Sequence, residues 1–429
     1  MNLYDELTWR GLVYDATDGL ADAFANERVT AYIGFDPTAS SLHIGNLLGL
    51  VTLARLQRYG HSPIAIAGGG TGMIGDPSGK SKERSLLTLD QINANLDGIK
   101  PQLAQFLDFH RPDNPARVVN NADWLAALDL LGFLRDTGKH FTVNYMLQKE
   151  SVNRRLESAD GISYTEFSYL LLQARDFLEL FERYGCTLQM GGSDQWGNIT
   201  AGIELIRKVH AKKAHGLVTP LVTTASGAKF GKTEAGTIWL DPSRTAVQEF
   251  RTFWLNTDDR DVVAYLKFFT FLTRAEIDEL DALVKNAPEE RAAQRVLADQ
   301  VTTLVHGADD ATRAESANAV LFSAKTRSVT VAESIHVADS LLAIADDVPS
   351  TTMAGTEFDG NGMSVVDVVA RVLGASKSEA RRLVQQGGVS VNDRRVTDVN
   401  ARLTRTDAID GRVFLVRKGG RQRFVIRLT

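Results

Sequence analysis

The 429-residue chain has a single cysteine, Cys186, and no long run of apolar residues. One thiol excludes an internal disulfide and a cysteine-based zinc cluster, and it favours a reducing compartment. No apolar run approaches membrane-spanning length. The N-terminus, M-N-L-Y-D-E-L-T-W-R, lacks the basic start and apolar core of a secretory signal. These absences predict a cytoplasmic protein without membrane association.

Charge is unevenly distributed along the chain, although the net charge is only −5. Residues 376–429 carry 13 Lys and Arg against 5 Asp and Glu, a balance of +8, which leaves −13 for the preceding 375 residues. A basic C-terminal segment on an otherwise acidic chain is typical of a protein that binds a polyanion. The length predicts about two to four domains.

The stretch Y-I-G-F-D-P-T-A-S-S-L-H-I-G-N at 32–46 organises the chain. A buried strand ending near Asp36 runs into a turn, and a helix follows from Leu42 with an N-cap at Ser40 or Ser41. His43 and Asn46 then share one face of the first turn, where backbone N–H groups and the helix dipole attract phosphate. Gly45 between them lets a planar ligand approach the backbone. Alone, H-x-x-N is more often an ordinary polar helix start.

A second strand at 63–67 completes a right-handed parallel unit and leads into G-G-G-T-G-M-I-G-D-P-S-G-K-S-K-E-R at 68–84. The spacing of these glycines matches a dinucleotide-binding motif, but a D-P pair interrupts the helix that this motif requires. The segment 75–81 is one residue short of a P-loop. We therefore predict a flexible glycine-rich loop at the ligand-binding edge of an open α/β sheet. It offers a carboxylate for an ammonium group and cations for polyphosphate: Asp76, Lys80, Lys82 and Arg84.

The run 123–160 is mainly helical and interrupts the strand–helix alternation. Its aromatic, Met and charged residues suit a subunit interface, although a plain helical hairpin fits equally. A helix at 163–184 follows, begun by a capping box of Ser163 and Glu166. One face of it carries a polar stripe without Lys or Glu, which favours recognition of a small polar ligand: Tyr169, Gln173 and Asp176.

Two later strands also end in polar loops. The first, at 187–190, precedes G-G-S-D-Q-W-G-N-I-T, whose glycines permit close approach of a ligand. Asp194 suits ribose hydroxyls, and Gln195 suits a carboxylate. The second, at 216–224, leads to Lys229 and Lys232, which would neutralise a leaving pyrophosphate. This loop fails the P-loop spacing too.

The blocks H-I-G-N at 43–46 and K-F-G-K-T at 229–233 resemble the HIGH and KMSKS signatures of class I aminoacyl-tRNA synthetases. Together, in this order and each after a strand, the signatures are specific. The blocks at 32–39, 75–80 and 191–200, with the polar stripe, narrow the resemblance to the bacterial tyrosyl-tRNA synthetases, over essentially the whole chain. This sequence departs from the signatures at Asn46, Phe230, Gly231 and Thr233, while both lysines are kept.

The resemblance implies an enzyme that activates L-tyrosine with ATP and transfers it to tRNA(Tyr). The residues implied for tyrosine are Tyr32, Asp76, Tyr169, Gln173, Asp176 and Gln195. Those implied for ATP are Gly34, Asp36, His43, Gly45, Asn46, Gly191, Gly192, Asp194 and Lys232. Those implied in catalysis are Thr38, His43, Asn46, Lys80, Arg84, Lys229 and Lys232. Mg²⁺ would accompany ATP without a dedicated protein site.

The resemblance also implies a domain order. Residues 1–225 would form a Rossmann-like parallel sheet, with a helical dimerisation insertion near 110–165 that makes the protein a homodimer. Residues 226–345 would hold the lysine loop and an α-helical anticodon-side domain, and 346–362 reads as a linker. The final part, 363–429, resembles the small RNA-binding domain of the ribosomal-protein S-four type. Its RNA-facing candidates are Arg381, Arg382, Arg394 and Arg395.

Two other functions remain open. A tryptophanyl synthetase uses the same chemistry, but an indole has no hydroxyl for Tyr32 and Asp176. A catalytically silent RNA-binding protein on this scaffold would not need to keep Lys229, Lys232, His43 and Gln195.

Overall fold

The computed structural model describes residues 2–78, 87–157, 161–225, 230–233, 236–323, 331–419 and 422–429. The chain forms two compact units. Unit 1 comprises 1–241 and 257–297, and unit 2 comprises 242–256 and 298–429. Among the described residues, no helix is long and apolar enough to cross a membrane.

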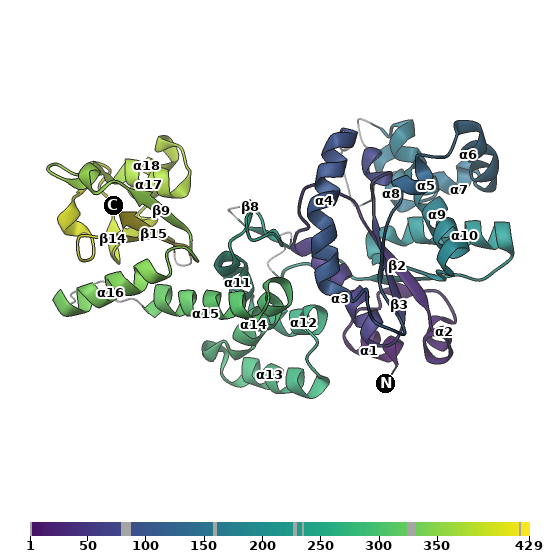
Figure 1. The fold of residues 1–429 in the computed structure, drawn as a ribbon, viewed down its shortest axis with the longest axis horizontal. Coiled ribbons are helices and arrows are strands. Elements are labelled where there is room, and N and C mark those ends of the chain that lie inside the picture. The colour runs from purple at the N-terminus through teal and green to yellow at the C-terminus, as the bar shows by residue number, and fades with distance from the viewer. Residues whose placement is uncertain are drawn as a thin grey trace. The chain divides into compact units, whose positions relative to one another are not determined.

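Unit 1 is built on a six-stranded sheet that is parallel except at one edge (Figure 1). Its strands, in spatial order, are β1 (Asp15–Ala16), β6 (His215–Thr219), β5 (Leu188–Gly192), β2 (Thr30–Phe35), β3 (Ser62–Ala67) and β4 (Arg117–Asn120). From β2 the chain proceeds to β3 and β4 on one side and later returns to β5 on the other. The order therefore reverses beside β2, and ligands bind at such a point in open α/β sheets. The predicted Rossmann-like parallel sheet is confirmed, although β6 ends at Thr219, five residues before the expected end of that strand.

Helices cover both faces of this sheet. Ile33 and Phe35 of β2 lie against α3, beside Gly49, whereas the alternate residue Tyr32 packs edge-on against Phe177 of α9. The helices of unit 1 are α1 (Leu3–Trp9), α2 (Leu20–Asn26), α3 (Ile44–Arg58), α4 (Leu89–Phe106), α5 (Ala122–Leu125), α6 (Leu130–Asp136), α7 (Val143–Leu147), α8 (Glu150–Leu156), α9 (Tyr164–Tyr184), α10 (Trp196–His210), α12 (Asp259–Phe269) and α13 (Arg274–Asn286). The helical insertion between β4 and α9 is as expected.

The N-cap of α3 is His43, so the prediction of Ser40 or Ser41 is wrong. The buried Ser41 hydroxyl is already engaged, because it accepts hydrogen bonds from Gln102 Nε2 at 3.0 Å and from the Asp241 N–H at 3.2 Å. At α9, Ser163 is the N-cap as expected, but the capping box is incomplete. The Glu166 carboxylate forms a buried ion pair with Arg155 at 3.0 Å instead of turning back to the cap.

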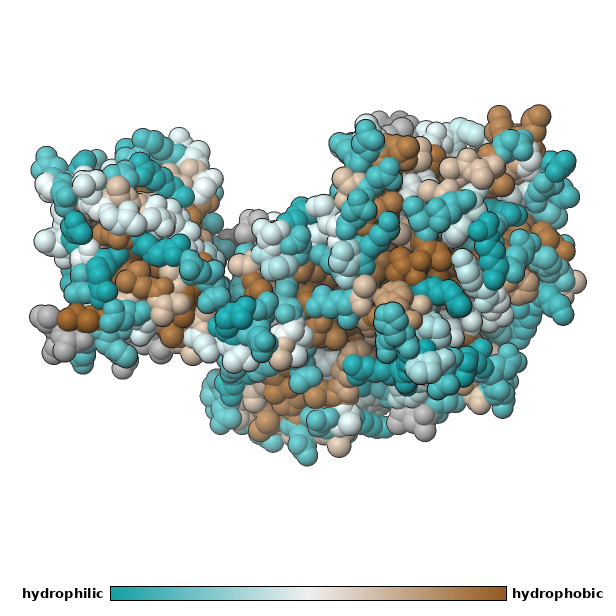
Figure 2. Space-filling view, in the orientation of Figure 1, coloured by the Kyte–Doolittle hydropathy of each residue, from teal (hydrophilic) through white to brown (hydrophobic). Residues whose placement is uncertain are grey.

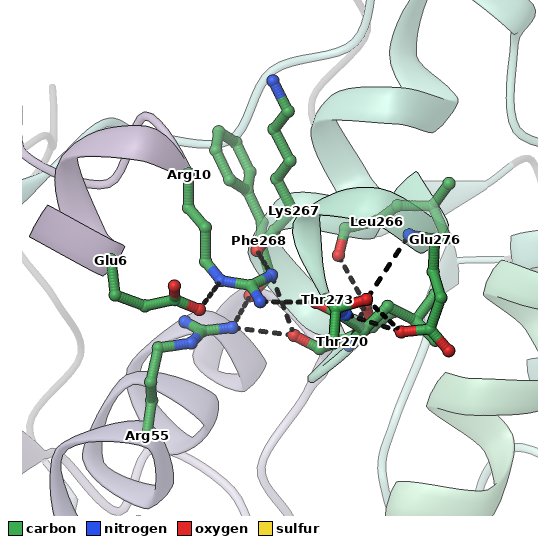
Figure 3. A network of polar contacts seen from close by, with 10 residues as sticks. Glu6, Arg10, Arg55, Leu266, Lys267, Phe268, Thr270, Thr273 and Glu276 are labelled. Carbon is green, nitrogen blue, oxygen red and sulfur yellow. Dashed lines mark hydrogen bonds and ion pairs between the residues drawn. The ribbon is translucent and has the colours of Figure 1, made fainter. Parts of the chain in front are cut away.

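Two buried arginines fix the C-terminal end of α12 within unit 1 (Figure 3). Arg10 of α1 is paired with Glu6 at 2.6 Å and donates to the carbonyl oxygens of Lys267 and Leu272 at 2.9 and 2.7 Å. Arg55 of α3 donates to the carbonyl of Thr270 at 2.8 Å. Burial, with the nearby Arg10, lowers the pKa of Arg55 to about 9. These guanidinium groups satisfy carbonyls at the helix end, so α12 belongs to unit 1 and not to the helical domain expected over 226–345.

Unit 2 contains the C-terminal sheet and its helices. The five-stranded sheet has the order β12 (Arg394–Val396), β11 (Val389–Val391), β14 (Val413–Lys418), β15 (Gln422–Leu428) and β9 (Ser350–Met353). A separate pair joins β10 (Met363–Ser364) to β13 (Arg402–Leu403). The helices are α11 (Val247–Leu255), α15 (Ala308–Ser323), α16 (Val331–Ala343), α17 (Val365–Leu373) and α18 (Lys377–Gln385), and α14 (Ala292–His306) enters the unit from residue 298.

Both faces of this sheet are buried. Phe414 and Val416 of β14 join one apolar cluster with α17 and α18. Val413 and Leu415, which alternate with them, join a second cluster with α15 and α16. Residues 350–353, which we assigned to a linker, form β9, and Met353 and Phe358 are buried. The final sheet is therefore packed into a larger unit and is not a tethered module.

Candidate active site

Polar side chains gather where β2, β3, β4 and β5 end. Asp36 follows β2, Thr71 follows β3 and Asn121 follows β4, while α9 supplies Asp176. The carboxyl ends of parallel strands meet at one edge, so residues far apart in sequence come within hydrogen-bond distance.

Asp176 is a buried carboxylate with a donor on each oxygen. Trp124 Nε1 donates to Oδ1 at 2.7 Å, and Asn121 Nδ2 donates to Oδ2 at 2.9 Å. Burial raises the pKa of Asp176 to about 7, although both hydrogen bonds act to lower it. Each carboxylate oxygen keeps a second lone pair for a ligand donor.

Tyr32 lies beside this carboxylate with a hydroxyl that has no hydrogen-bond partner among the described residues. The side chain is 2% exposed, and burial, followed by the charge of Asp176, raises the pKa of its phenol. An unpaired buried hydroxyl is unfavourable by about 1–3 kcal/mol. Such a group next to a carboxylate is suited to a ligand that both donates and accepts at one atom.

A second polar cluster surrounds Asp76. Its Oδ2 accepts from Gln195 Nε2 at 2.7 Å, and its Oδ1 accepts from the Ser78 N–H at 2.9 Å. Gln195 Oε1 in turn accepts from Gln173 Nε2 and Asn198 Nδ2, both at 3.2 Å. The structure thus brings together three of the residues implied for tyrosine, whereas Tyr169 donates elsewhere, to Asp36 Oδ2 at 3.3 Å.

His43 and Asn46 hold each other at the start of α3. His43 Nδ1 accepts from the Gly45 N–H at 3.0 Å, and the His43 N–H donates to Asn46 Oδ1 at 3.1 Å. A neutral ring that accepts at Nδ1 carries its proton on Nε2. The imidazole lies against Gly45, where a Cβ would stand 2.8 Å from its Cε1. Gly45 therefore also makes room for the histidine of its own chain.

The loop that carries the second signature is docked on this helix start. The N–H of Ile44 donates to the carbonyl of Ile238 at 3.0 Å, and His43 pairs with Trp239 in an isolated antiparallel bridge. Gly231 has a φ of +76°, and a Cβ there would clash with Ile44. Glycine in place of the serine of KMSKS is thus required by this packing. The backbone of β7 (Lys232–Thr233) pairs with β8 (Gly236–Thr237).

Phe230, next to the first signature lysine, is anchored on α12. Its ring stacks on Phe269 with centroids 5.6 Å apart and meets Tyr265 edge-on at 5.3 Å. Lys80, Arg84 and Lys229, and the side chain of Lys232, lie outside the described residues.

The remaining candidates differ in how open their surroundings are. Gly34 is the exposed position of β2, and a Cβ there would meet no atom within 4 Å. Beside Gly191 and Gly192, by contrast, a Cβ would meet Gln195 and Asp194 of the same chain at 3.0 and 2.8 Å. Thr38 is exposed after β2. Among the described residues, no group of His, Cys, Asp and Glu could hold a metal ion.

Four residues with contacts in the site were not anticipated from the sequence: Thr71, Asn121, Trp124 and Asn198. The signal for Asn121 was available, because it directly follows a short parallel strand at the ligand-binding edge. Asn198 lies three residues after Gln195 at the start of α10, where the two amides share a face. Thr71 and Trp124 carried no comparable local signal.

Comparisons with known proteins agree with this geometry. A family model described as tRNA synthetases class I (W and Y) matches residues 25–323. A second, described as the tyrosine–tRNA ligase SYY-like C-terminal domain, matches 340–426. The tyrosine–tRNA ligase of Roseiflexus castenholzii is 56% identical and that of Bacillus caldotenax 51%, with 100% of this chain and 99% and 100% of those chains covered. A C-terminally truncated mitochondrial tyrosyl-tRNA synthetase of Aspergillus nidulans superimposes with a TM-score of 0.66 at 33% identity, over 73% of this chain and 92% of that one.

The chain therefore belongs to the class I tRNA synthetases of the W and Y family. Both of these relatives, which the chain matches from end to end, are tyrosine–tRNA ligases.

Proposed function

We propose that this chain is a tyrosine–tRNA ligase. It activates L-tyrosine with ATP to tyrosyl-adenylate and pyrophosphate, and it then transfers tyrosine to the 3′ end of tRNA(Tyr). The observation that carries the proposal is the pair formed by the buried Asp176 carboxylate and the buried, unpartnered hydroxyl of Tyr32. A phenol donates to the first and accepts from the second, whereas phenylalanine would leave the Tyr32 hydroxyl unpaired and would donate nothing to Asp176, and an indole offers no such group.

The amino-acid backbone of the substrate belongs at the second cluster. Asp76, Tyr169 and Gln173 bind the ammonium group, and Gln195 lies near the carboxylate. The contact of Gln195 with Asp76 at 2.7 Å supports this assignment, because an amide can exchange one carboxylate partner for another as the substrate enters. The phenol and ammonium sites then define the length and direction of the bound amino acid.

ATP occupies the crevice beside β2 and β5. The open face of Gly34 supports a close approach of the nucleotide there. The residues that contact the nucleotide are Gly34, Asp36, Gly45, Gly191, Gly192 and Asp194. Mg²⁺ accompanies ATP. The tyrosine carboxylate attacks the α-phosphorus and pyrophosphate leaves, so no protein nucleophile is needed. Charge that develops in this step is stabilised by donors and cations: Thr38, His43, Asn46, Lys80, Arg84, Lys229 and Lys232.

The protein acts as a homodimer in the cytoplasm, with the helical insertion at the subunit interface. Leu130 and Leu131 of α6 are 71% and 75% exposed, and Figure 2 shows an apolar surface at this end of unit 1. Large exposed leucines on one helix favour a partner surface. Leu131→Asp is expected to shift the protein to monomers in sedimentation analysis. An unchanged sedimentation coefficient would exclude α6 from the interface.

The domain assignment follows the same proposal. Unit 1 supplies activation, and the C-terminal sheet with α17 and α18 supplies an RNA-binding surface of the S-four type. The exposure of Arg381, Arg382 and Arg394 supports contact with phosphates.

The decisive test is amino-acid-dependent exchange of pyrophosphate into ATP by the full chain, with each of the twenty amino acids in turn. Exchange with tyrosine alone is expected. Exchange with tryptophan would keep the reaction and overturn the phenol site. No exchange from folded protein would favour the alternative of a silent RNA-binding protein.

A further inference from the structure

The glycine run 68–70 is packed against side chains of its own chain. A Cβ on Gly68 would clash with Asp36 and Thr71, and one on Gly69 would clash with Asn120. The Gly70 N–H donates to Asn121 Oδ1 at 2.7 Å. The sequence predicted a flexible glycine-rich loop over 68–84, of which residues 79–84 lie outside the described residues. At 68–70 the structure shows a turn whose small residues make room for a polar network.

This network joins two carboxylates of the site, Asp36 and Asp176. Asn121 Nδ2 donates to Asp176 Oδ2 and to Thr71 Oγ1, both at 2.9 Å. Thr71 Oγ1 donates to Asp36 Oδ1 at 3.0 Å. Thr71 and Asn121 are 3% and 1% exposed, so water does not substitute for these contacts.

The donor and the acceptor of each hydrogen bond in this network can be assigned. A backbone N–H can only donate, so the atom of Asn121 that faces Gly70 must be its oxygen. The amide nitrogen of Asn121 therefore faces Asp176 and Thr71, and both of its N–H groups are used. Because the Thr71 hydroxyl accepts from Asn121, its own proton is left for Asp36. Thr71 therefore links Asp36 to the amide that holds Asp176.

We propose that Thr71 is a positioning residue that couples the nucleotide end of the site to the phenol end, so that selection of tyrosine over phenylalanine depends on its hydroxyl. This inference rests on the proposed function and deepens it. Without the hydroxyl, one N–H of Asn121 loses its acceptor and Asp36 loses a donor. The Asn121 amide is then free to turn away from Asp176, and the phenol loses an aligned acceptor.

The test compares Thr71→Val, which has nearly the same shape, with Thr71→Ser, which keeps the hydroxyl. Pyrophosphate exchange by the full chain gives kcat/KM for tyrosine and for phenylalanine, and the ratio of the two is independent of the fraction of folded enzyme. We expect Thr71→Val to lower this ratio about tenfold, as loss of one hydrogen bond to a charged network implies. Thr71→Ser should stay within about threefold of the wild type.

Thr52→Val is the matched control. Its hydroxyl is equally buried in unit 1 but bonds only within α3, to the carbonyl of Leu48 at 2.7 Å. The ratio should not change in this variant. If Thr71→Val does not fold, Thr71→Ala can replace it, because Ala removes the same hydroxyl and does not add the second methyl group that valine has.

Two failures can be told apart. If the wild-type chain does not prefer tyrosine, the proposed function is wrong. If the wild type prefers tyrosine and Asp176→Ala loses the preference, but Thr71→Val retains it, the function stands and the coupling through Thr71 is overturned. A ratio that falls equally in Thr52→Val would also overturn it, because general loosening of unit 1 would then be the cause.

Discussion

The proposed phenol site of unit 1 and the proposed RNA-binding arginine surface of unit 2 represent two opposite ways to recognise a ligand. Asp176 is 3% exposed and has a donor on each oxygen. Arg381, Arg382 and Arg394 are exposed, and no carboxylate of the described residues pairs with them. Arg395 is exposed as well, but its Nε donates to the Gly387 carbonyl at 2.8 Å, so part of it serves the end of α18.

The difference follows from what each region must distinguish. One hydroxyl is all that separates tyrosine from phenylalanine, and a hydrogen bond discriminates strongly only where water is excluded. A nucleic-acid backbone is recognised by accessible charge, which attracts at long range and discriminates little. In the proposed function, burial therefore provides selectivity in unit 1, and exposure provides affinity for RNA in unit 2.

The largest effect on activity is expected from a substitution of Asp176. Asp176→Ala leaves Trp124 Nε1 and one N–H of Asn121 without an acceptor in a desolvated site and removes the proposed acceptor of the phenol, so kcat/KM for tyrosine should fall about a thousandfold in pyrophosphate exchange. Asp22→Ala removes an exposed carboxylate of α2 and should have no effect. A loss below about tenfold in Asp176→Ala would show that the phenol is recognised elsewhere.

A substitution in β14 tests whether the C-terminal sheet is packed against the helices of unit 2. Leu415 is fully buried against α15 and α16, so Leu415→Ala should lower the free energy of unfolding of this unit by about 3 kcal/mol. Urea titration followed by hydrogen exchange of β14 and β15 isolates the relevant transition. Leu283→Ala, at a position 40% exposed on α13, is the control. A tethered module would leave Leu415 dispensable, with an effect below about 0.5 kcal/mol.

The pH dependence of stability sharpens the contrast, because the pocket carries a carboxylate whose pKa burial raises strongly. Burial raises the pKa of Asp176 from 3.8 to about 7, so between these values the folded protein binds more protons than the unfolded chain. The free energy of unfolding therefore falls as the pH rises through this window.

Asn at position 176 does not titrate, so Asp176→Asn is the reference. Between pH 5 and pH 7, the free energy of unfolding of the wild type should fall by about 2 kcal/mol relative to this variant. Thermal unfolding of both proteins at the two pH values measures the difference. Parallel pH profiles for the two proteins would mean that Asp176 is not desolvated.

The arginine surface should respond to salt and leave activation intact. Replacing Arg381, Arg382 and Arg394 together by Ala should keep tyrosine-dependent pyrophosphate exchange unchanged. Charging of tRNA should fall about tenfold in kcat/KM, with a shallower salt dependence. Deleting 363–429 is a poorer test, because it would expose the apolar residues of α15 and α16.

The control for this experiment uses cations that already have partners. Arg371 pairs with Glu357 at 2.8 Å and Lys377 with Asp367 at 2.7 Å, so Ala at both positions should affect charging much less. Equal losses in the two variants would indicate that net charge alone, and no particular surface, attracts the RNA.

Sequence reasoning succeeded where the signal is local. The strand at β2 and the polar stripe on α9 were found from periodicity within a few residues, and the two signatures were recognised by their resemblance to those of a known family. It failed where a distant partner decides between similar candidates. Ser41 has the better propensity for an N-cap than His43, but contacts with Gln102 and Asp241 remove its hydroxyl from that role. The linker prediction failed for the same reason, since β9 exists only because β15 lies beside it.

By itself, the sequence determined the groups available to this protein: an Asp and a Tyr for the proposed phenol site, amides for the proposed amino-acid site, and two signatures for the proposed nucleotide site. Only the tertiary structure decided how these groups are held. Asp36, Thr71, Asn121 and Asp176 are joined by hydrogen bonds that span 35, 50 and 55 residues of sequence. Contacts of that range leave no periodic trace in the chain, because they depend on which strands lie side by side in the sheet.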